Sequence, residues 1–99
     1  MDTQVANEIA AELKVPADKF LKVADTVIGL ANHSSTEMRK EAVHFAFLYA
    51  IARYGVFDWQ NGPQNEDQEA FIAKMLKRYE AMLREQLGDK KLKDRPVSP

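Results

Sequence analysis

The sequence predicts an all-α fold, an antiparallel bundle of three long helices plus a short N-terminal helix. Apolar residues recur every three or four positions over most of the chain, and no segment alternates apolar and polar residues as a half-buried strand does. The 99 residues, 45% apolar and 29% charged, are typical of one globular domain. We expect a single helical domain over residues 1–88. Residues 89–99 alternate charges without an apolar period, so we expect a flexible C-terminal tail.

The first helix is short. Val5, Ile9 and Leu13 are spaced by four and place apolar side chains on one helical face. Pro16 limits this helix, because proline lacks a backbone donor and disfavours helical geometry at the residue before it. The second helix begins near Pro16 and carries an apolar stripe over residues 20–31.

The third helix is predicted over about residues 35–58, with Ser34 and Glu37 as a capping box at its start. It is apolar nearly all round from residue 42 onward, so it needs cover on most sides and is expected to be the central helix. It also holds most of the aromatic residues, which we expect to supply much of the core. Gly62 and Pro63 stop it.

The fourth helix carries a broad apolar stripe over residues 71–87, and Gly88 closes it. Asn65 is expected to cap its start, with Gln68 at the position of the capping-box partner.

An alanine ridge runs along the central helix. Ala42, Ala46 and Ala50 repeat every four residues, and a neighbouring helix can approach such a ridge more closely than a row of leucines. Two alternatives stay open. Either the other helices of the chain cover the central helix, or a second copy does so as a homodimer across a two-fold axis.

Composition and charge limit the cellular environments and the classes of partner that we expect. The chain has no cysteine and a formal net charge of −1, and no segment before the tail is basic, so we expect no nucleic-acid partner. The first residues contain carboxylates and no continuous apolar run, so they are not expected to form a targeting signal. The most apolar stretch, residues 42–57, is shorter than the roughly 20 residues that a bilayer crossing needs. We expect a cytoplasmic protein with no membrane association.

Two patterns suggest chemistry only weakly. Glu41 and His44 match the Glu-x-x-His spacing of ferritin-like carboxylate bundles, but that site needs further glutamates which the chain lacks at matching places, so we predict no metal and no other cofactor. Residues 9–24 resemble a helix-turn-helix in layout, yet Lys19 and Lys22 are offset by nearby aspartates.

Asp25 and Arg53 each interrupt an apolar face, where an unpaired charge would be costly. The simpler interpretation is a structural ion pair between the second and third helices. The alternative adds Asn32, Tyr49 and Tyr54 to these two residues and forms a small polar binding pocket.

Four motifs carry a resemblance to a known family: Phe20 with Ala24-Asp25, Ile28-x-Leu30-Ala31-Asn32, Leu48-Tyr49-Ala50-x-Ala52-Arg53-Tyr54 with Phe57, and Tyr79-x-x-Met82-Leu83. Over about residues 20–88 the chain resembles a family of small uncharacterised proteobacterial all-helical proteins. The resemblance implies a helical fold and brings no assigned activity, substrate or cofactor. The chain departs from the family in its longer first helix, residues 5–14, and in His44.

These observations favour a non-enzymatic interaction or structural module whose partner is an unidentified protein or a second copy. The alternatives are a bundle that binds a small ligand or a metal and, third, a helix-turn-helix protein that binds DNA.

Overall fold

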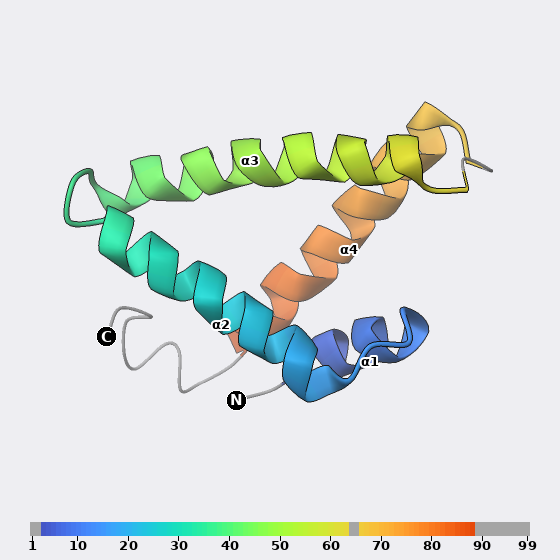
Figure 1. Ribbon diagram of the computed structural model, residues 1–99, viewed down its shortest axis with the longest axis horizontal. Coiled ribbons are helices and arrows are strands. Elements are labelled where there is room, and N and C mark those ends of the chain that lie inside the picture. Colours follow the sequence, from blue (N-terminus) through green and yellow to red (C-terminus); the bar gives the residue numbers. More distant parts are fainter. Residues whose placement is uncertain (1–2, 64–65, 89–99) are drawn as a thin grey trace.

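The computed structural model describes residues 3–63 and 66–88. It contains four helices, α1 (Gln4–Glu12), α2 (Ala17–Ser34), α3 (Lys40–Asn61) and α4 (Gln68–Gly88) (Figure 1). No strand occurs in these two ranges. The predicted all-α class, with three long helices and a short N-terminal one, is therefore confirmed. The predicted tail, residues 89–99, lies outside the described residues, and the extent of the domain stays a prediction.

The three long helices form the sides of an open frame (Figure 1). α2 contacts α3 beside the turn that joins them, and α1 contacts both α2 and α4. α3 and α4 meet where Trp59 stacks on Phe71 and diverge from there. The close antiparallel packing expected of a bundle stays a prediction.

Little of the described chain is buried. Ile9, Ala10 and Val43 are its buried apolar residues, whereas large apolar side chains are exposed on every long helix. One chain by itself thus leaves many of the large apolar side chains of its long helices uncovered.

α1 ends in a Schellman motif. The amide of Val15 donates to the carbonyl of Ala10 at 2.9 Å, and the amide of Lys14 donates to the carbonyl of Ala11 at 3.1 Å. Lys14 adopts φ 59°, the left-handed conformation that glycine usually supplies at this position. Pro16 then precedes the first residue of α2, close to the predicted start of the second helix.

Two side chains of α4 hold α1 at its two ends. The Glu85 carboxylate accepts a hydrogen bond at 2.8 Å from the amide of Val5, one of the amides at a helix start that lack a partner within the helix. Arg78 donates to the Glu12 carboxylate at 2.7 Å near the other end. These two contacts set α1 antiparallel to α4.

The start of the third helix differs from the prediction. α3 begins at Lys40 rather than near residue 35, and Ser34 is the last residue of α2. Ser34 does not form a capping box, because its hydroxyl donates back to the carbonyl of Leu30 at 2.9 Å. The hydroxyl of Thr36 also bonds backward, to the His33 carbonyl at 2.8 Å. Hydroxyls there satisfy carbonyls at the end of α2, an alternative that serine and threonine offer to capping.

The corner between α3 and α4 is held by Trp59, whose indole nitrogen donates to the carbonyl of Glu66 at 3.2 Å. Its ring lies 5.8 Å from that of Phe71. Asp67 accepts a hydrogen bond at 2.7 Å from the amide of Ala70 and so caps α4. Asn65, the predicted cap, lies outside the described residues.

Candidate interaction surface

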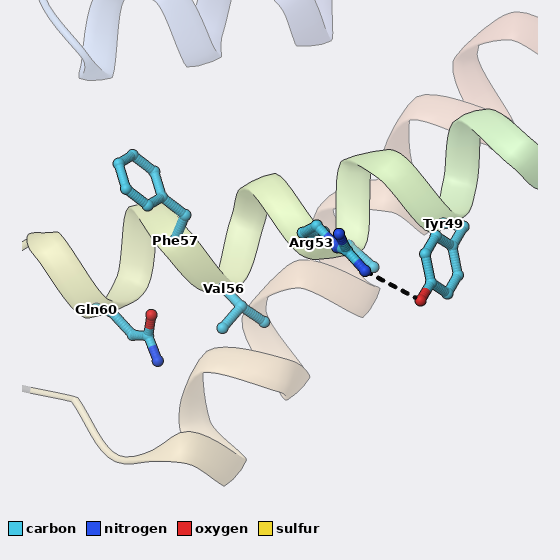
Figure 2. Close-up of a pocket in the computed structure, with 6 residues that line it drawn as sticks. Tyr49, Arg53, Val56, Phe57 and Gln60 are labelled. Carbon is cyan, nitrogen blue, oxygen red and sulfur yellow. Dashed lines mark hydrogen bonds between the residues drawn. The ribbon is translucent and has the colours of Figure 1, made fainter.

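One side of α3 is exposed along nearly the whole length of the helix. All of its members are exposed, and most are apolar or aromatic: Ala42, Phe45, Ala46, Tyr49, Ala52, Arg53, Val56, Phe57 and Gln60. We call this set the outer face of α3. Its second half lines an open hollow of about 460 Å³, and every side chain drawn around that hollow comes from α3 (Figure 2). The hollow is therefore a groove along one helix and not a cavity between elements.

Arg53 and Tyr49 form the polar centre of the outer face. A terminal nitrogen of Arg53 donates to the Tyr49 hydroxyl at 3.3 Å (Figure 2). The guanidinium carbon also lies 5.5 Å from the centroid of the Tyr49 ring, within the range of a cation–π interaction. The pair is separated by four residues, so helical geometry places both side chains on one face.

The contacts of α3 with the rest of the chain come from its other side. The His44 ring lies 3.4 Å from the Tyr79 hydroxyl, and a Cβ at Gly55 would lie 3.9 Å from the Phe71 ring. At 100° per residue, His44 and Gly55 are about 140° and 120° round the helix from Tyr49. Intramolecular contacts thus come from the side opposite the outer face, although Ile51 and Tyr54 on that side are exposed as well. Neither of these two contacts involves a residue of the outer face.

The predicted polar pocket is only partly assembled. Tyr49 and Arg53 are in contact, whereas Asp25 is exposed on α2 and forms no ion pair with Arg53 in the part of the chain that the structure describes. Asn32 is half-buried, and its carbonyl accepts the hydroxyl of Ser35 at 2.7 Å. Tyr54 is exposed, with its ring 5.9 Å from that of Phe57. The predicted binding role of these five residues stays a prediction.

Glu41 and His44 do not converge on a common point. Glu41 pairs with Arg39 at 2.9 Å, whereas His44 contacts Tyr79 and has its ring 5.4 Å from that of Phe45. Among the described residues, no three potential metal-ligating side chains gather together.

The segment with a helix-turn-helix layout folds as α1, a turn and α2. The start of α2 carries a hollow lined largely by apolar residues, among them Val15, Phe20 and Val23. Val23 is 66% exposed. The second helix of this pair thus presents an apolar surface where a DNA reader carries phosphate-binding and base-reading side chains.

Sequence reasoning placed the aromatic residues of the central helix in the core, and for several of them this was wrong. Phe45, Tyr49, Tyr54 and Phe57 are each more than half exposed. The signal that could have identified them is that α3 is apolar on all sides while one chain supplies too few helices to cover it. Their exposure indicates an open surface and not an enclosed pocket.

The comparisons with known proteins identify a family but assign no activity. None of the helices in the described ranges combines the length and apolar character needed to cross a bilayer. No curated protein and no solved structure matches the chain. A family model described as "Protein of unknown function (DUF3144)" matches residues 20–90, nearly the same span as the resemblance found in the sequence motifs. Since this match covers well over half of the sequence, the chain belongs to the DUF3144 family.

Proposed function

We propose that the protein is a non-enzymatic interaction module, which binds another protein through the outer face of α3. The observation that carries this proposal is the exposure of Phe45, Tyr49 and Phe57, at 62%, 68% and 57%, on one side of a single helix. Exposed apolar patches of this kind typically mark sites of association. The composition and the family resemblance further favour the cytoplasm of a bacterium as its location.

The shape of the surface favours a protein over a small ligand. Small-molecule sites are concave and enclose most of the ligand. The groove beside Tyr49 and Arg53 has walls from α3 alone, so a small molecule bound there would keep much of its surface in water. A helix or other extended surface can instead cover the whole outer face at once. Its aromatic residues and its arginine are the types enriched where proteins associate.

A photo-crosslinking experiment in cells tests the proposal. A benzophenone amino acid replaces Phe45 in the full chain, and a matched variant carries it at Lys77, an exposed position of α4. We expect irradiation to give a protein adduct of discrete mass at position 45 and none at position 77. The adduct at position 45 should disappear when Ala46→Glu is added, because a buried charge is costly at an apolar interface.

Two results would contradict the proposal. One is the absence of any adduct at position 45 while the protein is folded and expressed. The other is equal labelling at positions 45 and 77, which would show random collision and not a specific surface.

A further inference from the structure

We infer that the protein on the outer face of α3 is a second copy of the same chain, with the two α3 helices antiparallel across a two-fold axis at Tyr49. This inference rests on the proposed function, since it names the partner of the same surface. Three properties of the described residues support it: the area available, the self-complementary shape of the face and the position of its single charge.

The outer face offers much of the area that a stable dimer needs. A standard interface needs roughly 800 Å² from each partner. All nine residues of the outer face are exposed in the single chain. Phe45, Tyr49 and Phe57 alone expose on the order of 100 Å² each, since an aromatic side chain offers about 150–250 Å².

The face suits its own copy. A two-fold interface brings the same patch of both subunits together, so residues equally far from the axis along the helix face each other. With the axis at Tyr49, Ala46 lies opposite Ala52 of the second copy and Ala42 lies opposite Val56. Small residues opposite each other allow the helix axes to approach closely. Two residues of the predicted alanine ridge, Ala42 and Ala46, thus lie in this contact.

The charge of Arg53 selects the direction of the two helices. Arg53 is the only charged residue of the outer face. A parallel pair would set it beside the Arg53 of the second copy, and like charges in an apolar contact are costly. In the antiparallel pair it lies opposite Phe45, whose ring can accept the guanidinium as the Tyr49 ring does within one chain. The two arginines are then eight residues apart along the axis, about 12 Å.

Single cysteines test this register, because the chain has no cysteine of its own. We expect Tyr49→Cys to form an intermolecular disulfide under mild oxidation, since the two copies of residue 49 meet at the axis. Ala42→Cys is the matched control on the same face. Its two copies lie about 21 Å apart along the helix, beyond the roughly 7 Å between Cα atoms that a disulfide tolerates. Crosslinking at both positions would indicate a parallel pair and overturn the inference, as would crosslinking at neither.

Light scattering coupled to size exclusion tests the dimer itself. We expect a mass near twice 11.3 kDa for the unmodified chain. Ala46→Glu should raise the dissociation constant at least tenfold while helicity by circular dichroism persists. Leu76→Glu is the matched control, because Leu76 is 65% exposed on α4 and outside the proposed contact, and this variant should remain dimeric.

The outcomes separate the two proposals. A monomer at high protein concentration overturns the inference that the partner is a second copy. A dimer that is weakened as much by Leu76→Glu as by Ala46→Glu overturns it as well. If position 45 still gives a crosslinked adduct with a different protein in cells, the interaction module stands with another partner. If position 45 gives no adduct in cells, the proposed function fails as well.

Discussion

One terminal nitrogen of Arg78 donates hydrogen bonds to both carboxylate oxygens of Glu12, each at 2.7 Å, and ties the end of α1 to the middle of α4. The hydrogen bond and then the positive charge of Arg78 hold the pKa of the Glu12 carboxyl below its ordinary value of 4.5. Both side chains are partly exposed, so the surrounding water weakens the pair. Its importance lies in joining two elements that are far apart in the sequence.

The lowered pKa of Glu12 predicts how stability depends on pH. A carboxyl whose pKa is lower in the folded state stabilises the fold above its unfolded pKa, and this contribution is lost as the pH falls through the folded pKa. Glu12→Gln should therefore be less stable than the unmodified chain at pH 7, and the difference should shrink below pH 4.5. Urea midpoints measured from pH 3 to pH 7 check this. A difference that stays constant over the whole range would contradict it.

A matched pair of arginines provides the control for this contact. Arg84 forms an equally short ion pair with Glu80, 2.7 Å, but both residues belong to α4. Arg78→Met should release α1 and expose its amides to hydrogen exchange. Arg84→Met should change the free energy of unfolding by no more than about 0.5 kcal/mol, because exposed pairs within one helix contribute little.

The left-handed residue after α1 offers a stabilising substitution. Lys14 at φ 59° has a side chain in a conformation that costs roughly 1–2 kcal/mol for residues other than glycine. Lys14→Gly removes that cost but adds about 0.5–1 kcal/mol of backbone entropy to the unfolded chain. We expect a net gain of about 0.5–1 kcal/mol in urea melts. Lys14→Ala is the control and should give no gain, since alanine is strained there too.

Much of the fold was predictable from local patterns, and what was missed depended on contacts between elements. The apolar periods located the four helices, and Pro16 marked the boundary between the first two. Nothing in the local sequence pairs Glu12 with Arg78 or Val5 with Glu85, because those partners are 66 and 80 residues apart. Such contacts follow from the arrangement of the helices in space.

The candidate surface, too, was only partly predictable from local sequence patterns. The alanine ridge was identified from its spacing, and two of its three members, Ala42 and Ala46, belong to the outer face of α3. Tyr49 and Arg53 were both named as members of the alternative polar pocket, and both also belong to this face. Asp25 was joined to Arg53 because both interrupt apolar faces, but the pattern contains no information on which sides of α2 and α3 meet. When the sequence is read one residue at a time, an apolar surface that a second molecule covers has the same pattern as a buried core.

A double-mutant cycle tests the relation between Asp25 and Arg53. Since these side chains form no ion pair in the described chain, the effects of Asp25→Asn and Arg53→Met on unfolding should add within about 0.5 kcal/mol. Tyr49→Phe and Arg53→Met should instead be coupled, because one removes the hydroxyl that accepts from the other. A coupling above 1 kcal/mol between Asp25 and Arg53 would restore the predicted ion pair.

Alanine substitutions at Gly29 and Gly55, which lie inside helices, can distinguish a surface that the chain itself covers from a surface that a partner covers. A Cβ at Gly29 meets nothing within 4 Å, and one at Gly55 makes an ordinary contact of 3.9 Å with Phe71. Alanine is favoured over glycine in a helix interior by about 0.5–1 kcal/mol, so each alanine variant should gain roughly this amount in urea melts.

Gly55→Leu is the control for this pair of variants and should lose stability, because its larger side chain extends toward the Phe71 ring. The result at Gly29 is the more informative one. Gly29 lies in α2 between Ile28 and Leu30, both exposed in the single chain. If Gly29→Ala loses stability while Gly55→Ala gains it, another molecule approaches the backbone of α2 at that point. The contact between copies would then extend beyond α3, and Leu30→Glu should weaken the dimer as strongly as Ala46→Glu.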